Sequence, residues 1–159
     1  MAEAETLYDQ DFLRWTEQQA AALRAAPKDS NLPLDWENLA EEIESLGKSQ
    51  RAALRSQLRR ILRHLFKLEG SPAVGPRPGW EESIREARVE IEDILEDSPS
   101  LRREIDALIK KQAPIAAELA AGHLRQHGEP ADAIQARLDK GGFTAEEVVG
   151  DWFPGAKTP

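Results

Sequence analysis

A chain of 159 residues is long enough to enclose one hydrophobic core, and a formal net charge of −8 opposes a general affinity for nucleic acid or anionic lipid. The absence of cysteine excludes disulfides, thiolate metal sites and cysteine nucleophiles. With 40% hydrophobic and 31% charged residues, the composition is that of a folded domain rather than a disordered one.

The first residues are acidic, whereas a signal peptide needs basic residues followed by an apolar run. No later stretch reaches the length of a membrane span. We therefore expect a cytoplasmic protein that does not enter the membrane. The apolar spacing then predicts a first helix from about Leu7 to Ala25, and the segment from Pro27 to Pro33 breaks it.

Asp35 is a suitable N-cap for a second helix, whose apolar residues keep one register through Gly47. We predict one continuous helix from Trp36 to about Leu68. Its apolar face consists of Leu39, Ile43, Leu46, Gln50, Leu54, Ile61, Leu65 and Leu68. Residues 70–79 are rich in Gly and Pro and are predicted to form a flexible loop.

A third helix is predicted to start at Trp80, and a fourth to be capped by Ser98, with Pro114 on its solvent side. The apolar face of the fourth helix is predicted to hold Leu101, Ile105, Leu108, Gln112, Ile115, Leu119 and His123. A short helix over 131–140 then precedes a capping box from Thr144 to Glu147.

These elements predict an all-α fold, because no segment shows the alternating β-branched pattern of a strand. We expect a single domain over residues 1–159, with its core at about 7–154. Its architecture is a bundle of four main helices with a short C-terminal helical appendage.

Charge is segregated along the second predicted helix. Five acids and no base lie between Asp35 and Gly47, and seven bases and no acid lie between Lys48 and Lys67. This order suits the helix dipole. A basic stripe on the expected solvent side consists of Arg51, Arg55, Arg59 and Arg63.

The basic stripe has two interpretations. Its arginines either bind the phosphates of a nucleic acid, or form ion pairs with the acidic third helix within one molecule or across a dimer. The net charge and the absence of interleaved aromatic residues argue against nucleic acid.

Gln50, Gln57 and His64 recur at intervals of seven along the apolar face of the second helix, so that they form a polar row that requires partners. Glu42 lies close to this row, and Arg88 borders the apolar face of the third helix. One hypothesis makes Glu42 and His64, together with a third ligand from another helix, a metal site in the bundle core. The alternative is that His64 is a hydrogen-bonded structural residue.

The sequence contains no recognisable catalytic constellation. The loop at 70–79 lacks the Gly-Lys-Ser/Thr ending of a phosphate loop, and Arg77 within it is predicted to be a surface residue. No Ser/His/Asp order is apparent. We therefore expect no enzymatic activity and no cofactor.

Several motifs together resemble the bacterial "domain of unknown function 29" family. The resemblance covers about Tyr8 to Pro154 and implies a compact, all-helical bacterial domain without implying an activity. The loop at 70–79 departs from it, being richer in Gly and Pro than the polar linker expected there. The motifs are Tyr8-x-x-Asp11-Phe12-x-x-Trp15, Asp35-Trp36-Glu37-Asn38-Leu39-x-Glu41-Glu42-Ile43-Glu44-x-Leu46-Gly47, His64-Leu65-x-Lys67, Trp80 with Ile84-Arg85 and Arg88, and Asp97-Ser98-Pro99-Ser100-Leu101.

Three functional hypotheses follow. The leading one is a non-enzymatic interaction module that binds another protein or a second copy of itself through a helical face. The second is a small metal- or ligand-binding domain built on Glu42, His64 and Arg88. The third is nucleic-acid binding along Arg51 to Arg63.

Overall fold

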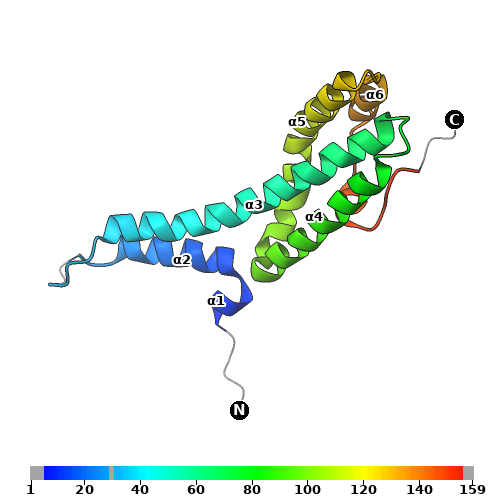
Figure 1. Cartoon of the computed structure of the whole chain (residues 1–159). Helices are drawn as coiled ribbons and strands as arrows, with labels where there is room; N and C mark the ends of the chain where they lie inside the picture. The colour runs from blue at the N-terminus through cyan, green and yellow to red at the C-terminus, as the bar shows by residue number, and fades with distance from the viewer. Residues whose placement is uncertain (1–5, 29–30, 156–159) are drawn as a thin grey trace, which may run out of the picture. The chain divides into compact units, whose positions relative to one another are not determined.

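The computed structural model describes residues 6–28 and 31–155, and in this part of the chain all regular structure is helical (Figure 1). The elements are α1 (Leu7–Gln10), α2 (Phe12–Ala25), α3 (Trp36–Gly70), α4 (Arg77–Asp97), the 3₁₀ helix η1 (Pro99–Glu104), α5 (Ile105–Gln126), α6 (Asp132–Asp139) and α7 (Ala145–Val149). The predicted all-α fold is confirmed, with four main helices, α2 to α5, and a short C-terminal helical part. None of the described helices combines the length and apolar character that crossing a bilayer requires.

The chain divides into two compact units, which are described separately. The first comprises residues 1–53 and 93–103, and the second comprises residues 54–92 and 104–159. Helices α3 and α4 each contribute residues to both units. The single domain expected over 1–159 stays a prediction.

In the first unit, the helix predicted over 7–25 is broken at Asp11, so that prediction was wrong. Asp11 has extended backbone angles, and its carboxylate accepts a hydrogen bond from the Arg14 N–H at 3.0 Å. The same carboxylate accepts the backbone N–H of Ser100 at 2.8 Å and its hydroxyl at 3.0 Å. Asp11 therefore starts α2 and ties it to η1, because a carboxylate satisfies the free N–H groups of a helix start.

Helix α3 runs through Gly47 without interruption, as predicted. The reason for glycine at this position is the approach of α2. A Cβ atom on Gly47 would collide with the Thr16 hydroxyl and come within 2.9 Å of a Leu13 methyl group. Small residues at this crossing allow the two helices to pack closely.

Helix α4 begins at Arg77, three residues before the predicted start, so the connection spans only residues 71–76. The expectation that Arg77 is a surface residue was wrong. Arg77 is buried and donates hydrogen bonds to the carbonyls of Leu68 and Pro154, both at 2.9 Å. These bonds hold the start of α4 against the end of α3 and the C-terminal segment.

Ser98 is followed by η1 rather than directly by an α-helix, and α5 begins only at Ile105. Pro114 lies inside α5 on its exposed side, as predicted. The predicted apolar face was wrong for Ile115 and Leu119, which are exposed. The buried side of α5 is instead rich in alanine, namely Ala113, Ala116, Ala117, Ala120 and Ala121.

Candidate functional site

In the first unit, α2 and the first part of α3 lie side by side as a helical hairpin (Figure 1). One side of the hairpin is ionic. Arg24 lies 2.7 Å from Glu44 and within 4 Å of two further acids of α3, and Arg51 lies 3.8 Å from Glu17. Because successive residues of a helix are rotated by about 100°, residues on the opposite flank of both helices share the other side of the hairpin.

That other side is apolar, and we name it the hairpin apolar face. It consists of Phe12, Trp15, Leu23, Leu39, Ile43 and Leu46. Leu39 and Leu46 are 40% and 50% exposed, and the other four side chains are half-buried. The prediction that Leu39 and Leu46 point into the core was therefore wrong.

Polar and aromatic groups lie at one end of this face. Tyr8 packs edge-on against Trp15, with ring centroids 4.8 Å apart. A shallow hollow of about 420 Å³ is lined by Tyr8, Asp9, Phe12, Gln50 and Asp97. The Gln50 side-chain oxygen is buried and accepts no hydrogen bond.

The structure does not bring the predicted metal ligands together. Glu42 is exposed in the first unit instead of turning inward, whereas His64 is buried in the second. Across residues 6–28 and 31–155, no group of three or more His, Cys, Asp and Glu residues is arranged to hold a metal ion. The metal hypothesis therefore gains no support from the structure.

The expectation of an exposed arginine stripe holds only for Arg55. Arg51 and Arg59 are half-buried, and Arg59 donates to the Gln112 side chain at 3.2 Å. Arg63 is half-buried too, and its Nε atom is sealed from solvent without a partner.

The expected pairing with the acidic helix is made by a different arginine. Arg60 lies 2.9 Å from Glu86 of α4 and donates to Ser83 at 3.0 Å. Nucleic-acid binding along the stripe stays a prediction.

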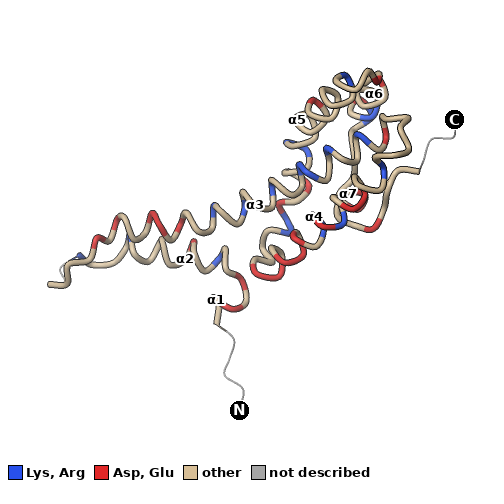
Figure 2. The backbone as a smooth tube through the Cα atoms, in the orientation of Figure 1, with Lys and Arg blue, Asp and Glu red and all other residues tan. Residues whose placement is uncertain are grey.

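In the second unit, basic side chains gather where α3 meets α4 and α5. We name the set Arg63, His64, Lys67 and His123 the basic cluster. His64 and Lys67 are only 7% and 6% exposed. The Lys67 ammonium lies 5.6 Å from the centre of the Trp80 ring, which in turn lies 6.1 Å from the His123 ring. Figure 2 shows the basic second half of α3, which supplies three of the four residues.

The polar row predicted along α3 includes buried atoms that lack partners. In this unit the Gln57 side-chain oxygen and His64 Nδ1 are buried without a hydrogen bond. The prediction that His64 is a hydrogen-bonded structural residue is therefore wrong for Nδ1. A buried polar atom without a partner is costly, and it calls for a physical explanation.

The electrostatic setting of the basic cluster is positive. Burial lowers the pKa of His64 to about 4, with further contributions from the charges of Lys67, Arg63 and Arg60. Burial also lowers the pKa of Lys67, and the nearby Arg63 adds to the effect. The pKa of His123 is lowered by burial first and then by Lys67.

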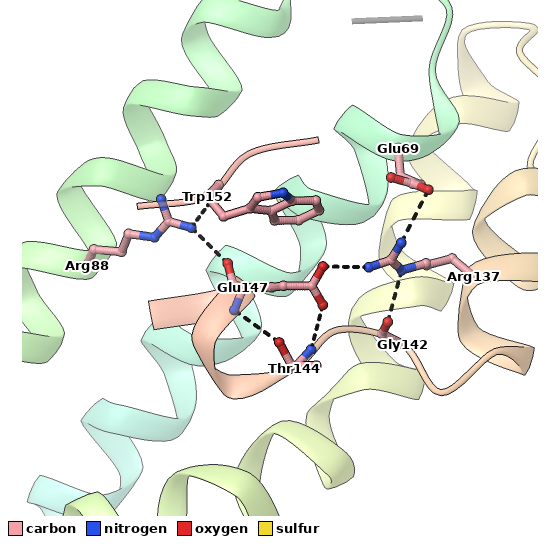
Figure 3. A network of polar contacts seen from close by, with 7 residues as sticks. All are labelled: Glu69, Arg88, Arg137, Gly142, Thr144, Glu147 and Trp152. Carbon is pink, nitrogen blue, oxygen red and sulfur yellow. Dashed lines mark hydrogen bonds and ion pairs between the residues drawn. The ribbon is translucent and has the colours of Figure 1, made fainter. Parts of the chain in front are cut away.

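Arg88 was predicted to border the apolar face of α4, and Figure 3 shows its hydrogen bonds to Glu147 and Trp152. It is buried and donates to the carbonyls of Val148 at 3.0 Å, Glu147 at 3.0 Å and Trp152 at 2.7 Å. Its guanidinium also lies 4.8 Å from the centre of the Phe153 ring. Arg88 therefore fastens the C-terminal segment to α4, because it satisfies carbonyls at the end of α7.

A second arginine of this network, Arg137, was not recognised in the sequence. It donates to the Gly142 carbonyl and to the Glu147 carboxylate, both at 2.9 Å, and lies 3.6 Å from Glu69 (Figure 3). Its guanidinium stacks 4.4 Å from the centre of the Phe143 ring. The available sequence signal was the capping box that fixes Glu147.

That capping box is confirmed. Glu147 accepts the backbone N–H of Thr144 at 2.9 Å, and the Thr144 hydroxyl accepts the N–H of Glu147 at 3.2 Å. The short helix before it is also present as α6.

An open groove of about 840 Å³ lies between α5 and residues 138–145. Ile109, Ala113, Pro114 and Phe143 contribute apolar surface to it. None of the buried polar atoms without a partner belongs to a residue that lines the groove. Asp106, Lys110, Lys140 and Thr144 contribute polar surface to it.

Comparison with known proteins gives a family and a related fold. The chain is similar to an alpha-helical protein of unknown function from Rhodospirillum rubrum ATCC 11170, with 26% identity and a TM-score of 0.76 over 96% of this chain and 94% of that chain. No curated protein matches the sequence. Residues 7–136 match the family described as "Domain of unknown function DUF29". The chain therefore belongs to this family, as its motifs indicated.

Proposed function

We propose that the protein is a non-enzymatic interaction module that self-associates through the hairpin apolar face. The observation that carries this proposal is the asymmetry of the hairpin. Its ionic side is neutralised by pairs such as Arg24 with Glu44, whereas its other side exposes Leu39 and Leu46. A surface that leaves large apolar side chains exposed next to half-buried aromatic residues is typical of a protein interface.

The charge distribution favours a second copy of the chain as the occupant. In a symmetric dimer the same patch meets itself, so any net charge on it repels its own copy. The protein carries a formal net charge of −8. A patch with an excess of acidic residues would therefore repel the same patch on a second copy. On α2, Glu17 and Arg24 belong to the ionic side, and on α3 Glu42 alone borders the apolar residues. The residues that form the hairpin apolar face thus carry no charge, and the acids next to it are Glu42 on α3 and Asp9 and Asp97 in the hollow at its end.

The geometry suits this occupant as well. Two antiparallel helices with one apolar side are half of a four-helix bundle, and a second hairpin supplies the other half. Each copy would bury the Leu39 and Leu46 side chains of its partner.

The test is the mass of the protein in solution, measured by light scattering and sedimentation over a concentration series. We expect a dimer, and we expect the double substitution Leu39→Glu/Leu46→Glu to produce a folded monomer, because both side chains are already exposed in one copy. Val89→Glu is the matched control, since Val89 is an exposed apolar residue of α4 outside this face. A wild-type protein that stays monomeric at every concentration would overturn the proposal, as would a double variant that still dimerises.

A further inference from the structure

We propose that the basic cluster of the second unit is a binding site for a phosphate group, either inorganic phosphate or the phosphate of a monoester. This inference concerns a different unit from the proposed interaction face and does not depend on it.

The first argument is the convergence of cations from separate elements. Arg63, His64 and Lys67 lie within two turns of α3, at spacings of one, three and four residues, so the three side chains emerge on adjoining parts of the helix surface. His123 comes from α5, and both His123 and Lys67 lie near the ring of Trp80 in the first turns of α4. Lys67, Arg63 and His123 are all close enough to His64 for their charges to act on its ring.

The second argument is that these groups lack partners, whereas their neighbours have them. Arg59 reaches Gln112, and Arg60 reaches Glu86. The Lys67 residue is 6% exposed, and its ammonium lies 5.6 Å from the centre of the Trp80 ring. No side-chain hydrogen bond or ion pair of Lys67 is found within the described chain. A largely desolvated ammonium without a carboxylate partner is unfavourable, and an anion that reaches it from solvent would compensate its charge.

The unpartnered atoms extend beyond Lys67. Arg63 Nε and His64 Nδ1 are both buried without a hydrogen-bond partner in the described structure. Elsewhere the same unit satisfies its buried guanidiniums fully, as Arg77 and Arg88 show by their bonds to backbone carbonyls. Of the three buried side-chain atoms without a partner in the described part of this unit, Gln57 Oε1, Arg63 Nε and His64 Nδ1, two belong to the basic cluster.

The carboxylates of the surroundings are already engaged. Glu86 pairs with Arg60 at 2.9 Å, and Glu129, which faces His123, accepts a hydrogen bond from the Ser71 hydroxyl at 2.7 Å. A metal cation would add to the positive charge of the cluster, whereas an anion neutralises it. The cluster therefore selects an anion rather than the metal ion considered from the sequence.

The donor set matches phosphate in particular. Lys67 offers a compact charge with three donors, and Arg63 offers a planar group that binds two oxygens of an oxyanion. Two permanent cations balance a phosphate dianion, whereas a single carboxylate neutralises only one of them. His64, which is neutral at pH 7 in the free protein, gains a proton more readily once the anion is bound.

The experiment titrates the full-length protein with inorganic phosphate, and in parallel with phosphoserine, while NMR follows the ring signals of His64 and His123. We expect saturable shifts of both signals. Lys67→Gln should weaken binding about tenfold, as loss of one charge-assisted hydrogen bond does. Lys111→Gln, an equal charge change at an exposed lysine of α5, should leave the affinity unchanged. Tighter binding of phosphoserine would assign the site to a monoester, and equal binding would assign it to free phosphate.

Thermal unfolding separates a binding role of Lys67 from a structural one. In phosphate-free buffer Lys67→Met should raise the Tm, because it removes a buried charge that lacks a partner, and phosphate should stabilise the wild type but not the variant. Histidine signals that do not move with phosphate would overturn the proposal. Equal affinities of Lys67→Gln and Lys111→Gln would do the same, as would a lowered Tm of Lys67→Met together with an undiminished response to phosphate.

Discussion

The pH dependence of the free energy of unfolding tests whether the pKa of His64 is lowered in the folded protein. In the folded protein, burial and the neighbouring positive charges lower its pKa from 6.5 to about 4. The unfolded chain therefore binds a proton between these two values while the folded chain does not. Stability is fully present above the unfolded pKa and falls as the pH drops from about 6.5 towards about 4, because protonation then favours the unfolded state.

The magnitude follows from the size of the shift. One pKa unit corresponds to about 1.4 kcal/mol, so a shift of about 2.5 units is a loss of about 3 kcal/mol once the pH has fallen below both values. Between about pH 7.5 and about pH 5, the same linkage predicts a loss of about 2 kcal/mol from His64 alone.

The assay is urea unfolding of the wild type and His64→Gln at these two pH values. Glutamine does not titrate, so subtracting the pH dependence of the variant removes the contributions of all other groups. We expect the wild type to lose about 2 kcal/mol more than the variant over this interval. Two results would show that the surroundings do not hold the ring neutral. One is an equal loss of unfolding free energy in the two proteins, and the other is an NMR titration of His64 with a midpoint of about 6.5.

Two further predictions concern packing. Gly47→Ala should destabilise the protein by about 1–2 kcal/mol in thermal unfolding, because the collision with Thr16 outweighs the better helix propensity of alanine. Its control is Gly122→Ala in α5, which has no atom within 4 Å of the added Cβ and should be stabilised by up to about 1 kcal/mol. Arg88→Met should lower stability by about 2–4 kcal/mol and speed amide hydrogen exchange over residues 145–155, and unchanged exchange there would contradict its role as a fastener.

The sequence predicted those features that local chemistry decides. The unbroken α3, the capping box at Thr144 and the exposed Pro114 depend on residues a few positions apart, and the structure confirms all three. The break at Asp11 was missed even though Asp is a strong N-cap residue. Its second role, holding Ser100, lies 89 residues away and has no local signal.

The periodicity of apolar residues identifies an apolar face, but it does not predict whether the same chain buries that face. Leu39 and Leu46 continue the register of Leu54 and Ile61, yet only the latter pair is fully buried. The spacing of apolar residues is the same whether the cover comes from the same chain or from a partner. On α5, small alanines occupy the buried side and leave Ile115 exposed, so residue size misled the prediction there.

Basic residues show the same limit in a form that bears on function. From the sequence, Arg77 was predicted to be a surface residue and Arg88 to border an apolar face, and nothing local indicated the environment of Lys67. The structure separates them by their partners, since the two arginines donate to backbone carbonyls, whereas the Lys67 ammonium lies 5.6 Å from the centre of the Trp80 ring. Because backbone carbonyls accept hydrogen bonds from both arginines, contacts within the fold explain why these two side chains are buried. Lys67 has no such partner within the described chain, and this difference is the reason why we propose that a phosphate group supplies its counter-charge.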